Sequence, residues 1–377
     1  KMIRISKAQR ITSIADFIAS RYGKSQLLAG MVTVIAVIGV VPYIALQLKA
    51  MAASVDVLLE HSGNSVEVWG LDSTFLIAVV LAMFSILFGT RHLDATERHE
   101  GMVAAVAFES VVKLVAFMAV GIFVTYGMFG GLGDLFQRAA SSANLERLLH
   151  LDSGRAGTWT ALIILSGLAI IFLPRQFQII VVENVDESHL KRAVWLFPLD
   201  RLLIDIFVLP LALGGLLHFD GQGVNPDTFV LTRPLARGAE ALALLAFIGG
   251  LSAATGMVIV ETIALSTMVC NDLVMPILLR LRRYGAAAEG DLTGLLLAIR
   301  RGVIVLLLLL GYVYFRVAGE AYALVSIGLI SFAAVAQFAP ALLGGIFWKG
   351  GTRAGALAGL TAGFVLWAYT LMLPSIA

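Results

Sequence analysis

Hydrophobic residues in this chain gather in nine long stretches, and polar or charged segments separate them. About 20 consecutive apolar residues form a helix that can cross the hydrocarbon core of a bilayer. The pattern therefore predicts an all-α polytopic membrane protein with about nine spans. The expected spans are 27–55, 73–89, 102–130, 157–180, 194–217, 242–275, 302–317, 321–347 and 354–373.

Composition agrees with this pattern and excludes several classes of protein. The chain has 377 residues, of which 59% are hydrophobic and 14% are charged. A soluble domain of this length needs far more charge to cover its surface. The single cysteine, Cys270, excludes an internal disulfide framework. No phosphate-binding loop, metal-ligand cluster or nucleophile motif is present, so we expect no enzyme activity, metal, cofactor or nucleic-acid partner for this segment.

Charges between the stretches predict the orientation in the membrane. The segment before the first stretch and every second loop after it are rich in lysine and arginine, whereas the other loops are acidic or mixed. The positive-inside rule then places the N-terminus in the cytoplasm and the C-terminus outside. The basic set is Lys1, Arg4, Lys7, Arg10, Arg21, Lys24, Arg91, Arg98, Lys191, Arg192, the arginines of 276–301, Lys349 and Arg353.

Three segments are not expected to be simple helices that cross the bilayer at right angles. Stretch 242–275 is too long for a perpendicular crossing, so we expect it to tilt or to project into the cytoplasm. Residues 233–241 are predicted to form a re-entrant or surface helix, and the outer loop 131–156 a pair of short amphipathic helices.

Several motifs, in the right order along the chain, resemble the sodium/solute symporter family, the group of the proline permease and the sodium/glucose transporters. They are ITSIADFIASRYGKS at 11–25, TERHEG at 96–101, FQII at 177–180 and FAAVAQFAPALLGGIFW at 332–348 with the basic turn after it. Segments 88–114, 173–186 and 246–260 are most similar to a branch of this family that is fused to a sensor histidine kinase of the carbon/nitrogen-balance type, with histidine as its kind of substrate.

The resemblance implies a LeuT-type fold of two inverted repeats, with solute and ions bound at broken helices near the middle of the membrane. Against that template, residues 1–377 form a single domain that lacks the first helices, so we expect further helices before Lys1 and after Ala377 and an incomplete pocket. The implied function is solute binding, with an amino acid such as histidine as the solute, in a bacterial inner membrane, linked to a cytoplasmic kinase and a response regulator. The alternative is a stand-alone sodium/solute symporter.

Charged residues at membrane depth usually face protein or water, and each has a functional and a structural interpretation. Glu109 and Lys113 are four residues apart and can pair on one helix face. They form either a structural ion pair or a relay for protons or solute. Glu97, which lies beside the third stretch, is either a solvated loop carboxylate or, as the resemblance implies, a gating or coupling residue. Arg201 and Asp205 have the same spacing and are interpreted as a packing pair.

Glu261 has no charged residue one turn away on its own helix. An unpaired carboxylate in a low-dielectric site favours its neutral form, which makes Glu261 a candidate for proton coupling. The alternative is a carboxyl group bonded to a hydroxyl or backbone group of a neighbouring helix.

Other polar residues are candidates for the solute cavity or for a gate. Tyr43 and Gln47 share one face of the first stretch, and together with Gln337 they either line the cavity or bond between helices. Arg175 and Gln176 follow the helix-breaking Pro174 and either form an inner gate or, in the case of Arg175, anchor the helix at the interface.

The resemblance also implies where sodium would bind. Symporters of this family place two hydroxyl groups side by side on the matching helix, and counting back from Asn271 puts those positions at Gly256 and Met257. Neither has a side-chain oxygen, although Ala253 can offer a carbonyl. The degenerate positions argue against sodium coupling and favour proton coupling or none.

Overall fold

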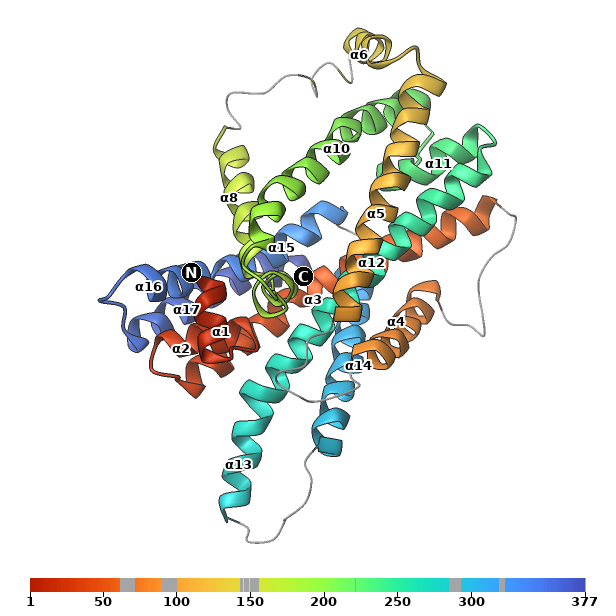
Figure 1. Ribbon diagram of the computed structural model, residues 1–377. Coiled ribbons are helices and arrows are strands. Elements are labelled where there is room, and N and C mark those ends of the chain that lie inside the picture. Colours follow the sequence, from red (N-terminus) through yellow and green to blue (C-terminus); the bar gives the residue numbers. More distant parts are fainter. Residues whose placement is uncertain are drawn as a thin grey trace.

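Every regular element in the described part of the chain is a helix (Figure 1). The computed structural model describes residues 1–61, 72–89, 100–142, 145, 149, 156–220, 222–284, 293–318 and 323–376. In the first half the helices are α1 (Met2–Gln9), α2 (Ile14–Arg21), α3 (Gln26–His61), α4 (Ser73–Gly89), α5 (Glu100–Ile122), η1 (Phe123–Met128), α6 (Leu132–Ser141), α8 (Ala156–Phe172), α9 (Pro174–Phe177) and η3 (Gln178–Val182). In the second half they are α10 (His189–His218), η4 (Pro226–Thr228), α11 (Phe229–Ala236), α12 (Glu240–Met268), η5 (Val269–Val274), α13 (Met275–Tyr284), α14 (Thr293–Ala318), α15 (Leu324–Ala336), α16 (Ala339–Phe347), α17 (Arg353–Trp367), η6 (Ala368–Met372) and α18 (Leu373–Ile376).

The predicted apolar stretches are mainly helical where they are described, and the chain is a multi-pass membrane protein. Six helices are long and apolar enough to cross a bilayer alone, and the bent pair α8–α9 makes a seventh. The other two predicted spans are α4, whose apolar part is shorter, and α10, which also carries several charges. The six are Gln26–His61, Gly101–Met128, Glu240–Leu279, Thr293–Ala318, Leu324–Phe347 and Arg353–Ile376.

Helix α3 lies at the centre of the bundle and is the most buried of the spans. It packs against α15, α14, α12 and α4, and α12 packs in turn against α5 (Figure 1). Pro42 lies inside α3, and the amide of the next residue, Tyr43, donates to the Ser331 hydroxyl of α15 at 2.9 Å. This bond ties α3 to α15 at the level where proline disturbs the helix.

The helix predicted to break at Pro174 does so. The axes of Ala156–Phe172 and Pro174–Val182 differ by 53°. Leu173 between them has extended backbone angles, as the residue before a proline prefers. The break places the short α9 helix against α12, inside the bundle.

Stretch 242–275 belongs to one long helical run. Helix α12 passes through the π-helical turn η5 into α13, which extends away from the bundle next to the end of α14 (Figure 1).

The expected helix at 233–241 is placed too late in the chain. Helices η4 and α11 cover 226–236, and α12 begins at Glu240. Arg233, which the sequence pattern places at the start of that re-entrant or surface helix, is fully buried. In the outer loop, α6 confirms the first of the two short helices, and most of the second lies outside the described residues.

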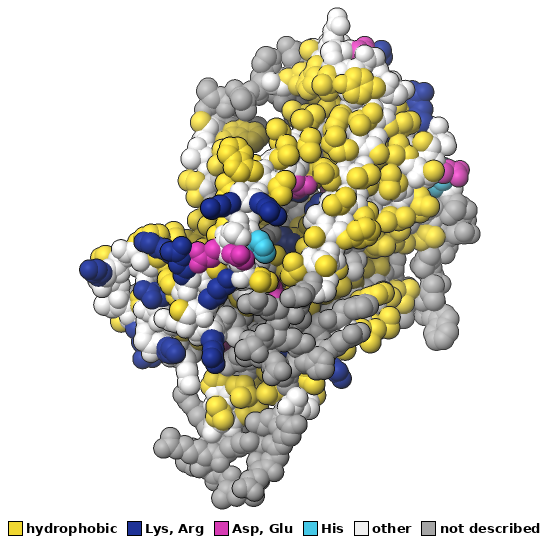
Figure 2. Space-filling model, in the orientation of Figure 1, with side chains coloured by type: hydrophobic (Ala, Val, Ile, Leu, Met, Phe, Trp, Pro, Cys, Tyr) yellow, Lys and Arg dark blue, Asp and Glu magenta, His cyan; other side chains and the backbone are white. Residues whose placement is uncertain are grey.

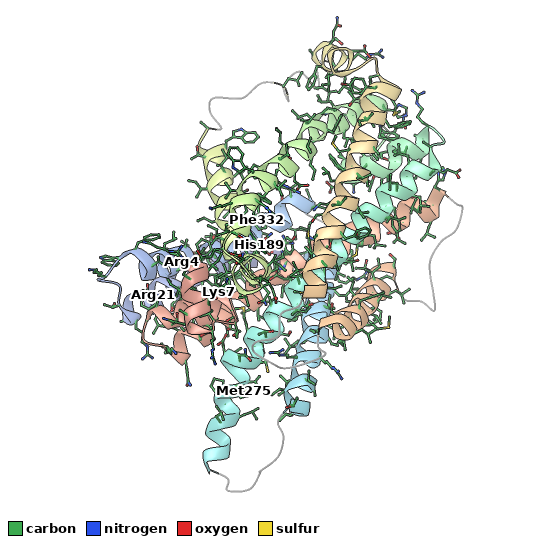
Figure 3. The ribbon with its side chains drawn as sticks, viewed as in Figure 1. Arg4, Lys7, Arg21, His189, Met275 and Phe332 are labelled. Carbon is green, nitrogen blue, oxygen red and sulfur yellow. The ribbon has the colours of Figure 1, made fainter. Side chains whose placement is uncertain are left out.

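The outer surface matches a chain surrounded by lipid. Figure 2 shows hydrophobic side chains over the region of α5 and α10, where Phe108 and Trp195 are among the most exposed residues. Lysine and arginine side chains gather instead over the region of α1 and α2. There Arg4 pairs with Glu187 at 2.9 Å and Lys7 donates to the carbonyl of Val185 at 2.8 Å (Figure 3), so α1 is held against the segment that follows η3.

Replacing Gly39 by leucine should lower the unfolding temperature. A Cβ atom at Gly39 in α3 would lie 2.5 Å from Cβ of Ala334 in α15, so the two central helices cannot accept a larger residue here. Overpacking of this kind costs about 2 kcal/mol. Gly302→Leu on α14, where a Cβ meets nothing within 4 Å, is the matched control. Equal unfolding temperatures of the two variants would contradict the packing described.

Candidate functional site

A cavity of about 430 Å³ lies beside the broken helix. Helices α5, α8, α9, α10 and α12 form its walls, and Phe332 of α15, near the centre of the molecule in Figure 3, contributes an aromatic surface. The lining includes five charged and three uncharged polar side chains, which is unusual for a space between membrane helices. These residues are Glu109, Lys113, Arg175, Asp200, Arg201, Ser110, Ser166 and Gln176.

Glu109 reaches the cavity because α12 has a glycine opposite it. The Glu109 carboxylate occupies the space that a Cβ atom of Gly256 would fill. The two helices also approach closely at Gly249, where a Cβ would lie 2.6 Å from that of Ala116. Small residues allow this kind of contact between membrane helices. No salt bridge joins the described residues Glu109 and Lys113, because the Glu109 carboxylate turns towards α12.

Arg175 lies between the cavity and a buried carboxylate. Its Nε is 3.6 Å from Oε2 of Glu261, and the side chains of the two residues are 14% and 0% exposed. Neither oxygen of Glu261 has a hydrogen-bond partner, and neither has Nε of Arg175. The prediction that Glu261 has no partner on its own helix is correct, but an arginine from α9 supplies the opposite charge. The pair is therefore close enough to attract and is incompletely bonded, so a proton or a bound solute can change its state.

Tyr43 connects α3 to this pair. The guanidinium of Arg175 lies 4.7 Å from the centre of the Tyr43 ring, and the Tyr43 hydroxyl donates to Sδ of Met257 at 3.0 Å. The Tyr43 ring also stacks on the ring of Phe332, with 6.3 Å between the two ring centres. Tyr43 itself is 5% exposed, so it supports the wall of the cavity and holds Arg175 in place.

The predicted sodium positions have neighbours of a different kind. Gly256 and Met257 both line the cavity, and Ala253 is buried one turn earlier on α12. A carboxylate oxygen of Glu109 lies against the backbone of Gly256. The thioether sulfur of Met257 accepts a hydrogen bond from the Tyr43 hydroxyl. A hydroxyl side chain could not be added at 256 without moving Glu109.

The remaining candidates are spread over other places. Gln176 lines the cavity. Gln47 is 8% exposed on α3 and is not among the lining residues, and Gln337 donates to the carbonyl of Ala333 and borders a different pocket. Glu97 lies outside the described residues.

Asp200 and Arg201 line the cavity, whereas the sequence pattern gave Arg201 only a packing role. The predicted pair of Arg201 with Asp205 is wrong, because Arg201 pairs with the adjacent Asp200 and lies 5.8 Å from the centre of the Phe197 ring. The sequence did contain a signal for these residues, because Asp200, Arg201 and Asp205 place three charges within six positions of an apolar stretch. Helical spacing favours ion pairs between residues one turn apart. It does not predict that Arg201 pairs with Asp200, its immediate neighbour in the sequence.

Comparisons with known proteins identify the fold. No model of a known protein family matches the chain. The uncharacterized symporter YhjB of Bacillus subtilis (strain 168) is 24% identical over 232 residues, which are 60% of this chain and 43% of that protein. A Na⁺-coupled sialic acid symporter, solved in a substrate-bound outward-open state, superposes with a TM-score of 0.60 over 98% of this chain and 79% of its own, at 15% identity.

The chain has a LeuT-type symporter fold. The predicted fold class is thus confirmed. The chain spans less than half the length of the curated relative it matches. Both of these proteins are described as symporters, and neither description mentions a histidine kinase.

Proposed function

We propose that this chain is the solute-binding core of a secondary transporter. The observation that carries the proposal is the charged cavity beside a broken helix in a symporter fold. In such folds the solute binds where a helix is interrupted near the middle of the membrane. Charged groups of both signs are held there at a large cost in solvation, and a bound polar solute compensates for part of that cost.

The solute in this proposal is a small zwitterion of the amino-acid class, histidine included. Lys113 of α5 and Arg175 of α9 offer positive charge to a carboxylate, and Glu109, one turn from Lys113 on α5, offers negative charge to an amino group in the same cavity. Charge complementarity of this kind favours a solute with both groups over a sugar or a simple anion. The cavity, at about 430 Å³, has the size of a small-molecule site.

Coupling to protons is the second part of the proposal. The buried Glu261 lies 3.6 Å from Arg175, which itself lines the cavity, so protonation of the carboxylate would release the guanidinium towards a bound solute. The absence of hydroxyl side chains at Gly256 and Met257 supports the same choice over sodium.

The setting proposed is a bacterial inner membrane, with the N-terminus of this chain in the cytoplasm, as the basic loops indicate. No enzymatic step belongs to the proposal. A sensing role, in which the module signals to a kinase and a response regulator, rests on motif resemblance alone. The relatives found are symporters, so transport is preferred.

A screen of amino acids by thermal shift on the purified full-length protein tests the proposed solute class. At least one zwitterionic amino acid should raise the unfolding temperature in a saturable way, since a ligand stabilises the state that binds it. Uptake of that compound into proteoliposomes should then be measured. A response to sugars or simple anions only would reject the proposed class.

Replacing Lys113 by glutamine should weaken solute binding about tenfold or more, because a charge-assisted contact contributes at least 1.4 kcal/mol when it is removed from a cavity of this kind. The measurement is the concentration of half-maximal thermal shift or uptake. Lys191→Gln on the exposed start of α10 is the matched control and should leave that concentration unchanged. Equal behaviour of the two variants would remove Lys113 from the site.

A further inference from the structure

Arg233 is a fully buried cation that the proposed transport site does not use. It lies on α11, is 0% exposed and is the largest of the fully buried side chains in the described part of the protein. Its Nε, Nη1 and Nη2 atoms have no hydrogen-bond partner. Arginine has five N–H donors in a fixed geometry, so this is a large unmet capacity.

Neighbouring elements close tightly around the guanidinium. Its centre lies 5.5 Å from the middle of the Phe129 ring. A Cβ atom built on Gly214 of α10 would lie 3.0 Å from Nη2 of Arg233 and 3.0 Å from Val124 of η1. Thr125, the next residue of η1, is also fully buried, and its hydroxyl has no partner. Arg233 on α11 and Thr125 on η1 are thus both buried donors without a partner.

The charges around Arg233 are positive. Burial first, and then the positive charge of Arg237, lower the pKa of Arg233 to about 10, so the side chain stays charged at neutral pH. His218, at the end of α10, lies in the field of the same two arginines. Among the described residues no carboxylate forms an ion pair with Arg233. An isolated ion in a dry interior costs several kcal/mol, and a counter-ion is the usual means of reducing that cost.

We infer that Arg233 holds a small monovalent anion of the chloride class. Full burial of Arg233 and the tight contacts at Gly214 favour a single-atom anion over a carboxylate solute. The site lies among α10, α11 and η1, away from the residues that line the transport cavity. The anion would link these three elements and would stabilise the folded bundle without taking part in solute recognition.

Chloride dependence of stability tests the inference on the purified full-length protein, independently of transport. Replacing gluconate by chloride at constant ionic strength should raise the unfolding temperature in a saturable way, by roughly 3 °C or more. Arg233→Met should lose this rise. Arg237→Met, which removes an exposed charge from the same helix end, should keep it. Equal unfolding temperatures of the wild type in the two salts, or an undiminished rise in Arg233→Met, would overturn the inference.

A second measurement avoids dependence on the folding of the variant. Crystals of the wild-type protein grown with bromide should show anomalous density beside the guanidinium of Arg233. Absence of such density, in crystals that diffract well enough to show bromide elsewhere, would overturn the assignment as well.

Discussion

Arg175→Met should abolish solute accumulation and destabilise the protein by about 3 kcal/mol. The substitution leaves the fully buried carboxylate of Glu261 without its opposite charge, and an uncompensated buried ion is far more costly than a missing surface contact. It also removes the cation that lies over Tyr43 and lines the cavity. Thermal unfolding and uptake into proteoliposomes measure the two effects.

The double variant Arg175→Met with Glu261→Gln separates the two effects. Because it removes both charges, it should recover most of the lost stability and still fail to accumulate solute. Arg192→Met on the exposed start of α10 is the control for loss of a positive charge and should behave as the wild type. Stability of the double variant no better than that of Arg175→Met would show that the pair is not coupled as described.

Gly256→Ala should reduce uptake at least tenfold, since one added methyl group occupies the place of the Glu109 carboxylate. The carboxylate must then shift within the cavity or part α5 from α12, and either change alters the solute site. A displacement of this size in a binding site commonly costs two orders of magnitude in rate. The measurement is initial uptake, normalised to the amount of folded transporter.

Gly250→Ala is the matched control for that prediction. It lies on the same helix, and a Cβ atom there meets nothing within 4 Å, so it adds the same methyl group without a collision. It should keep normal uptake. A further variant, Gly256→Ala with Glu109→Ser, should relieve the collision and recover helix packing but not transport. Normal uptake by Gly256→Ala would show that Glu109 is not held at this position.

The fold could be predicted from the sequence to a large extent because the bilayer imposes a simple rule. Each span needs a long apolar stretch, and the chain shows nine of them. The break at Pro174 was also predictable, since proline removes a backbone donor and biases the residue before it. The short helix α11 was misplaced because polar residues and Pro234 interrupt its pattern.

Side-chain partners across helices could not be predicted in the same way. Spacing along one helix suggested Glu109 with Lys113 and left Glu261 alone, whereas the structure places Glu109 at Gly256 and Glu261 beside Arg175. These contacts depend on where one helix crosses another, which a single sequence does not encode in its local pattern. Arg233 was missed for a related reason, because an arginine near a loop is usually solvated.

The most direct test of the account is uptake driven by each gradient separately. Full-length protein in proteoliposomes should accumulate an amino acid identified by thermal shift when an inward proton gradient is imposed without sodium, and Glu261→Gln should remove that dependence on the gradient. Accumulation that requires a sodium gradient and is unchanged by Glu261→Gln would contradict the assignment of coupling to the buried pair of Glu261 and Arg175.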